Sequence, residues 1–226
     1  KIEVYNEIKK VDPSVVVKIH PRNNINNISK NNKKIIPLSG ISNAKTLYCN
    51  ENGYYSMYQS DRYGFNNPDN QWDSKEVKYL LLGDSFVDGA CVDRPYDIGS
   101  NLRSLSQKTV LNLGQSANGP MMSLAILKEY FRPNVKNIIW IFTEANDIYN
   151  LEQEKKSKIL NKYLSNKNYK QNLILYQDEI DKISKEIISQ SIEDNNKILS
   201  DLKLFLTLSK SRIIIRNISK KNYKDN

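Results

Sequence analysis

The sequence predicts an α/β protein built around a parallel β-sheet, with a small β-hairpin extension ahead of it. Apolar, strand-like runs at 77–82, 109–113 and 137–142 alternate with helix-like segments, an order typical of βα units joined by right-handed crossovers. The chain has 226 residues, 39% of them hydrophobic, which is enough to bury one sizeable α/β core. We expect the sheet to be incomplete at its C-terminal end.

The first strand-like run ends in a sharp turn. Leu80 to Leu82 form a short apolar stretch, as expected of a strand that is covered on both faces. Gly83 allows a tight turn, and Ser85 follows just beyond the carboxyl end of the strand, where open α/β sheets bind their ligands. Backbone N–H groups at the start of a following helix stabilise negative charge. Ser85 is therefore a candidate nucleophile for attack on a carbonyl.

Two further units repeat this arrangement. We expect 109–113 to form the second strand and 137–142 to form the third. Between them, Pro120 suits the first turn of a helix, apolar residues at helical spacing continue it to Phe131, and Pro133 marks its end. The carboxyl ends of the three strands are predicted to lie side by side at one edge of the sheet.

Residues 1–76 are predicted to form the N-terminal extension. Its hairpin strands are expected at 46–49 and 54–58, because the intervening Asn52-Gly53 is a strong turn signal. A β-branched run at 15–19 predicts another strand, and 35–38 is predicted to be an edge strand because its proline cannot donate to a ladder. The tyrosines here are expected to pack the small sheet; the alternative is that they line a sugar-binding surface.

Residues 77–226 are assigned to the α/β domain itself, with a helical layer or lid over 150–210. Ile180, Ile183 and Ile187 share one face of a predicted helix in this segment. A run of isoleucines between two arginines at 212–216 predicts one further strand.

Three short motifs resemble the SGNH, or GDSL-type, hydrolases. Gly83-Asp84-Ser85 resembles the first motif block of that family, and 111–114, Leu-Asn-Leu-Gly, is similar to the second. The third block, Gly-x-Asn-Asp, is similar to 144–147, where Glu144 replaces the glycine. The resemblance covers roughly residues 77–150. The sequences at 60–65 and 117–120 are similar to those of SGNH-like proteins of bacterial surface-polysaccharide systems.

The resemblance implies a three-layer α/β/α, flavodoxin-like fold and serine chemistry on an ester. It makes Ser85 the nucleophile, and it makes the Ser85 N–H, the Gly114 N–H and the Asn146 side-chain amide the oxyanion donors. Asp84 and Asp147 are instead expected to satisfy nearby backbone groups. The implied substrate is an acylated carbohydrate or a similar small ester, and the implied location is the bacterial cell envelope.

The catalytic base is missing from this pattern. The family places it in a fourth block, Asp-x-x-His, but residues 148–226 contain no histidine. The one histidine, His20, lies before Ser85, has Val17 where the block would have its aspartate, and sits beside a proline, as loop histidines do. Two hypotheses follow: a serine esterase or O-acyltransferase cut before its fourth block and nearly inactive as it stands, or a catalytically inactive, carbohydrate-binding relative.

Other classes of function find little support. The net charge is +9, but basic and acidic residues are mixed along the whole chain, which favours a solvated surface over a nucleic-acid interface. No apolar run approaches the roughly 20 residues of a membrane helix. Two cysteines and one histidine are too few for an ordinary zinc site, and no phosphate-binding glycine loop occurs, so no metal or cofactor is expected. Cys49 and Cys91 either form a disulfide or are two small buried side chains.

Overall fold

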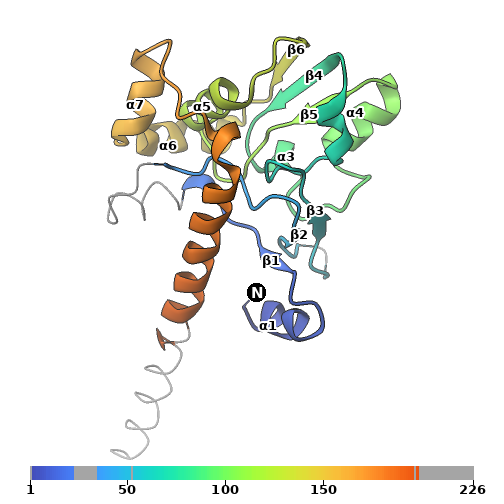
Figure 1. The fold of residues 1–226 in the computed structure, drawn as a ribbon, viewed down its shortest axis with the longest axis vertical. Coiled ribbons are helices and arrows are strands. Elements are labelled where there is room, and N and C mark those ends of the chain that lie inside the picture. Colours follow the sequence, from blue (N-terminus) through green and yellow to red (C-terminus); the bar gives the residue numbers. More distant parts are fainter. Residues whose placement is uncertain (1, 23–34, 52, 196, 199–226) are drawn as a thin grey trace, which may run out of the picture. The chain divides into compact units, whose positions relative to one another are not determined.

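The computed structural model describes residues 2–22, 35–51, 53–195 and 197–198 (Figure 1). The chain divides into two compact units, residues 1–187 and residues 188–226. The described residues of the second unit are helical. Both sheets belong to the first unit, and so does the predicted boundary between residues 76 and 77.

The central sheet has three parallel strands in the order β5-β4-β6. β4 (Val77–Leu82) lies in the middle, between β5 (Val110–Asn112) and β6 (Val135–Trp140). The sheet forms at the three runs predicted from the sequence, and their predicted parallel arrangement is confirmed. Their carboxyl ends meet at one edge, so the loops that follow them are neighbours.

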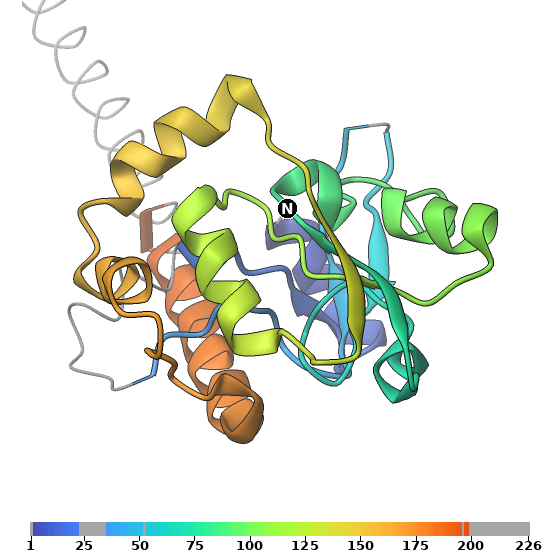
Figure 2. The ribbon, with the colours of Figure 1, turned by 90° about the horizontal axis from the view of Figure 1, so that it is seen from above.

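Helices cover both faces of β4. Its Leu80 lies in the main core with residues of α5 (Pro120–Tyr130), whereas Leu81 packs in a smaller cluster with Leu102 of α4 (Ile98–Ser106). Side chains alternate between the two faces along a strand, so α5 and α4 lie on opposite sides of the sheet, as Figure 2 shows. The protein is therefore a mixed α/β protein, as predicted.

β6 is an edge strand of this sheet. Within the described part of the chain it pairs with β4 alone. Ile138 and Trp140 point to the same face as Leu80, yet they remain 45% and 43% exposed. The strand predicted at 212–216 lies outside the described residues.

The N-terminal segment begins with α1 (Ile2–Val11) and then forms a second, smaller sheet. β1 (Val16–Val17) runs parallel to β2 (Lys45–Leu47), and β2 pairs antiparallel with β3 (Met57–Gln59). The predicted hairpin is confirmed, with Gly53 at φ +86° in its connection. Its second strand starts at Met57 rather than residue 54, so the connection is longer than the predicted turn. A short 3₁₀ helix, η1 (Asp69–Asp73), leads on to β4.

The edge strand predicted at 35–38 is wrong. These residues are buried coil, most of them in the main core, and no ladder forms there. The side chain of Gln171 replaces a partner strand: its Oε1 accepts a hydrogen bond from Ile36 N at 2.9 Å, and its Nε2 donates one to Ile36 O at 3.2 Å. An amide side chain can satisfy both backbone groups of one residue, so burial did not require a strand.

The segment after β6 is helical, as predicted for its described part. α6 (Glu144–Glu154), α7 (Lys158–Ser165) and η2 (Leu173–Tyr176) are followed by a helix from residue 177 onward. Ile180 and Ile183 of that helix are buried in the main core. None of the described helices combines the length and the apolar character needed to cross a membrane.

Candidate functional site

Ser85 lies just beyond the carboxyl end of β4, at the first position of α3 (Ser85–Asp88). Gly83 makes the connection with φ +154°, and a Cβ there would lie 2.5 Å from a Val87 methyl group and 2.8 Å from Ile141 O. The position therefore requires glycine, and the sharp turn predicted from the sequence is present. α3 is a single turn, so negative charge near Ser85 would be stabilised by individual N–H groups rather than by the dipole of a long helix. The Ser85 residue is partly exposed.

Asn146 is held beside this turn by Asp84. Asp84 is fully buried and caps α3: its Oδ1 accepts a hydrogen bond from Phe86 N at 3.1 Å. Its Oδ2 accepts a second one from Asn146 Nδ2 at 2.9 Å. The structure thus brings the Asn146 amide, from the first turn of α6, to the residue next to Ser85, although the two positions are 62 residues apart in sequence.

Gly114 is buried against α3. A Cβ at this position would come within 2.6 Å of Asp88 N and 2.7 Å of Val87 Cβ, so the glycine allows α3 to approach the end of β5. Its N–H already donates to Asn112 Oδ1 at 2.9 Å. Donation from Gly114 to an oxyanion stays a prediction, because it requires the Asn112 carbonyl to give way.

Asn112 is a residue whose importance the sequence pattern did not indicate. It is buried, its Nδ2 donates to Val87 O at 2.5 Å, and its backbone N–H donates to Asn67 Oδ1 at 2.8 Å. Asn112 therefore ties the end of β5 to α3 through its side chain and to the loop before β4 through its backbone. The asparagine in the Leu-Asn-Leu-Gly run was the available signal, since a buried strand rarely carries an amide without a partner.

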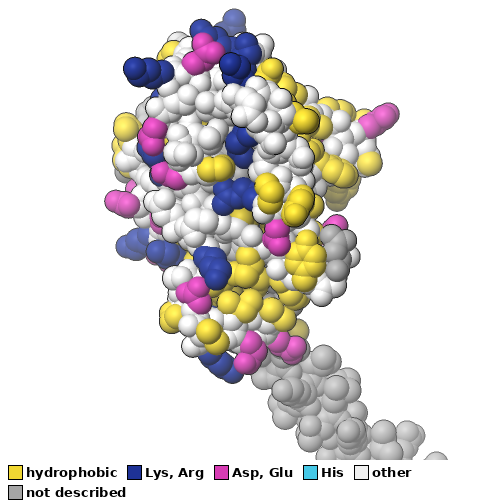
Figure 3. All heavy atoms as spheres, turned by 90° about the vertical axis from the view of Figure 1, so that its right-hand side faces the viewer, with side chains coloured by type: hydrophobic (Ala, Val, Ile, Leu, Met, Phe, Trp, Pro, Cys, Tyr) yellow, Lys and Arg dark blue, Asp and Glu magenta, His cyan; other side chains and the backbone are white. Residues whose placement is uncertain are grey.

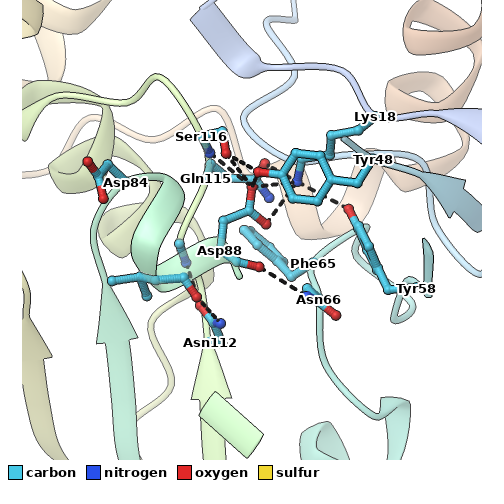
Figure 4. A network of polar contacts seen from close by, with 12 residues as sticks. Lys18, Tyr48, Tyr58, Phe65, Asn66, Asp84, Asp88, Asn112, Gln115 and Ser116 are labelled. Atoms are coloured by element: carbon cyan, nitrogen blue, oxygen red, sulfur yellow. Dashed lines mark hydrogen bonds and ion pairs between the residues drawn. The ribbon is translucent and has the colours of Figure 1, made fainter. Parts of the chain in front are cut away.

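A second group missed by sequence analysis is the buried cluster around Asp88 (Figure 4). Lys18 Nζ lies 3.0 Å from Asp88 Oδ2, both side chains are fully buried, and the lysine also donates to Gln115 Oε1 at 2.8 Å and to Tyr58 OH at 3.1 Å. Burial lowers the pKa of Lys18, but the neighbouring Asp88 carboxylate and Tyr58 outweigh it and leave that pKa above its ordinary value. The lysine within an otherwise apolar run at 15–19 was the only sequence signal.

The other oxygen-bearing groups around Asp88 complete the cluster. Tyr48 OH donates to Asp88 Oδ2 at 2.6 Å and also contacts the Ser116 hydroxyl, and Ser116 N donates to the same carboxylate oxygen at 3.0 Å. Burial, reinforced by the Asp88 charge, raises the pKa of Tyr48, which therefore remains a proton donor. The cluster joins the N-terminal segment, α3 and the loop after β5 into one packed unit.

His20 belongs to a segment that runs along the same end of the sheet. Its ring centroid is 6.3 Å from that of Tyr48. Two residues before it, Lys18 contacts α3; two residues after it, Arg22 donates to Asn150 Oδ1 of α6 at 2.7 Å. A cavity of about 530 Å³ lies beside α6 and α7 and is lined in part by Arg22, but the three candidate residues are not among those that line it.

Asp147 has a structural role, as expected. Its Oδ2 accepts a hydrogen bond from Thr143 N at 2.7 Å, at the start of α6. Burial raises its pKa above the ordinary range, and the nearby Asp84 carboxylate adds to this effect. The carboxylate thus satisfies backbone at the loop that carries Asn146.

Cys49 and Cys91 are joined in a disulfide, which settles the alternative that the sequence left open. The described residues include no group of three or more His, Cys, Asp or Glu side chains that could hold a metal ion. On the face shown in Figure 3, lysines and arginines are interspersed with acidic and apolar side chains.

The fold and the candidate residues together define a mixed α/β protein with a serine at the carboxyl edge of its parallel sheet. Comparisons with models of known protein families, with curated proteins and with solved structures found no match for this chain.

Proposed function

We propose that this protein acts on esters by SGNH-type serine chemistry, hydrolysing or transferring an acyl group carried by a carbohydrate or a similar small molecule. The observation that carries the proposal is that Ser85 lies just beyond the carboxyl end of β4, with the Asn146 amide hydrogen-bonded to the adjacent Asp84. The coverage of opposite faces of the sheet by α4 and α5 supports the finer proposal of a three-layer, SGNH-like fold.

The proposed reaction has two steps. Ser85 Oγ attacks the acyl carbon while a base takes its proton, and the alcohol leaves with that proton, so that the acyl group stays on Ser85. Water or a sugar hydroxyl then takes the acyl group by the reverse sequence. The oxyanion formed in each step would be stabilised by the Ser85 N–H and by the second hydrogen of Asn146 Nδ2, since its first is bound to Asp84.

The second candidate function is a non-catalytic, carbohydrate-binding module. Two observations favour it: the chain has a single histidine, and the Gly114 N–H is already engaged by Asn112. Catalysis requires a general base, which would come either from an Asp-x-x-His block in the whole protein or from His20.

Turnover of a short-chain p-nitrophenyl ester separates these functions. We expect the chain to be a weak catalyst, and we expect Ser85→Ala to remove what turnover there is, while Ser104→Ala, an exposed serine on α4, leaves it unchanged. Asn146→Ala should lower kcat by roughly 10²–10³-fold, with less effect on KM, because its bond to the oxyanion matters most in the transition state.

The other possible outcomes also distinguish between the two functions. Loss of turnover in His20→Gln would identify His20 as the base. Turnover that survives Ser85→Ala contradicts the serine mechanism, and an inactive native chain that still binds carbohydrate supports the second function.

A further inference from the structure

Asp84 makes two contacts with one carboxylate, and they join the two parts of the proposed oxyanion site. Oδ1 binds Phe86 N of α3, and Oδ2 binds Asn146 Nδ2 of α6. In the described part of the chain this is the one hydrogen bond between α3 with its capping residue and the first turn of α6. The Asp84 side chain is short and fully buried, so the distance between Ser85 and Asn146 can vary little.

We propose that Asp84 is a positioning residue that sets the orientation of the Asn146 amide toward the Ser85 site. This inference rests on the proposed function, and it assigns Asp84 a task beyond capping α3. An asparagine amide can adopt two orientations, related by a flip that exchanges the positions of its N and O atoms. The wrong orientation would turn an acceptor, rather than a donor, toward the developing oxyanion.

The surroundings of Asn146 leave this choice to Asp84. Asn146 Oδ1 is buried and has no hydrogen-bond partner in the described structure, so nothing on that side favours the oxygen. A flipped amide would place Oδ1 against Asp84 Oδ2, two acceptors facing each other at hydrogen-bond distance. The carboxylate therefore accepts from Nδ2 and keeps the second Nδ2 hydrogen available for a ligand.

This geometry predicts how exchanged side chains behave. Asp84→Asn can satisfy Phe86 N or Asn146 Nδ2 but not both, because its amide has a single acceptor atom. Asn146→Asp places two carboxylates in contact. The double exchange Asp84→Asn with Asn146→Asp restores a donor–acceptor pair with the donor and acceptor reversed, and the oxygen of the amide at position 84 still caps Phe86 N.

The test combines unfolding midpoints with binding of a small alkyl boronic acid, which forms a tetrahedral, negatively charged adduct on a serine hydroxyl. Binding is followed by ¹¹B NMR in the native chain, both single exchanges, the double exchange, Ser85→Ala and Asp147→Asn. Asp147→Asn is the matched control, because Asp147 is a buried carboxylate that caps the same loop through Thr143 N without touching Asn146.

We expect Asp84→Asn to weaken boronate binding by roughly 10-fold or more, and Asp147→Asn to change it less than 2-fold. The double exchange should regain most of the lost unfolding midpoint but none of the boronate affinity, because the carboxylate now at position 146 cannot donate. Native affinity in Asp84→Asn, or affinity regained by the double exchange, would overturn the positioning role. Equal binding by native chain and Ser85→Ala, or no binding by either, would instead overturn the proposed serine site.

Discussion

At the scale of single residues, the buried pair of Lys18 and Asp88 combines a large desolvation cost with a strong electrostatic attraction. The two side chains are fully buried and lie 70 residues apart in sequence. Taking both charges out of water costs several kcal/mol for each ion, and the mutual attraction offsets this only because Tyr48, Tyr58 and Ser116 complete the hydrogen bonding. The pair ties the residue that follows β1 to α3, the helix that carries Ser85.

Replacing Lys18 should therefore lower the free energy of unfolding far more than replacing an exposed lysine. Lys18→Met leaves the Asp88 charge buried without its cation and should lower the free energy of unfolding by about 3–5 kcal/mol. Lys45→Met is the matched control, because Lys45 pairs with Asp12 at 3.5 Å while 51% exposed, and it should cost less than about 1 kcal/mol. Urea unfolding of the three proteins measures both values; similar losses in the two variants would contradict the burial argument.

At the scale of elements, α3 is positioned more by its neighbours than by its own length. It has four residues, too few for a stable isolated helix. Asp84 caps its start, Asn112 binds Val87 O, and Asn66 Nδ2 donates to Asp88 O at 3.0 Å. The glycine at position 114 then lets the helix lie directly against the end of β5.

Gly114→Ala should displace α3. The added Cβ would meet backbone and a branched side chain, neither of which can rotate away, so we expect a loss of about 1–3 kcal/mol or more in stability and shifted Val87 methyl resonances in NMR spectra. Gly53→Ala is the control. No atom lies within 4 Å of a Cβ there, so it should incur only the strain of φ +86°, about 1–2 kcal/mol, and leave Val87 unchanged. Unshifted Val87 resonances in Gly114→Ala would show that α3 is not seated on this glycine.

At the scale of the first compact unit, the N-terminal segment and the central sheet are linked covalently as well as by packing. The Cys49–Cys91 disulfide joins the hairpin connection, next to Tyr48, to the loop that follows α3. It closes a loop across 42 residues, and a crosslink of that span restricts the unfolded chain. The residues assigned to an extension thus help to hold the candidate site in place.

Reduction of this disulfide should lower the free energy of unfolding by about 2–5 kcal/mol. Urea unfolding with and without a phosphine reductant measures the change. The double variant Cys49→Ser with Cys91→Ser should already show the lower stability and should not respond to the reductant. Equal stability of the oxidised and reduced native chains would mean that the crosslink adds nothing to the fold.

The local features of this protein follow from short stretches of its sequence. Apolar runs marked β4, β5 and β6, helical spacing and prolines bounded α5, and Asn-Gly marked the hairpin connection, because each of these depends on residues a few positions apart. The three short motifs likewise point to Ser85, Gly114 and Asn146 as candidate site residues.

The way in which those features are joined depends on contacts between distant parts of the folded chain. The tertiary structure places Ile35–Leu38 in the core as coil paired with Gln171, engages the Gly114 N–H with Asn112, and links Asp84 to Asn146 and Lys18 to Asp88. The physical reason is that three of these pairings, Gln171 with Ile36, Asp84 with Asn146 and Lys18 with Asp88, span 60 or more residues, and buried polar groups choose their partners by packing and desolvation. Periodicity along the chain carries no information about which distant donor meets which acceptor.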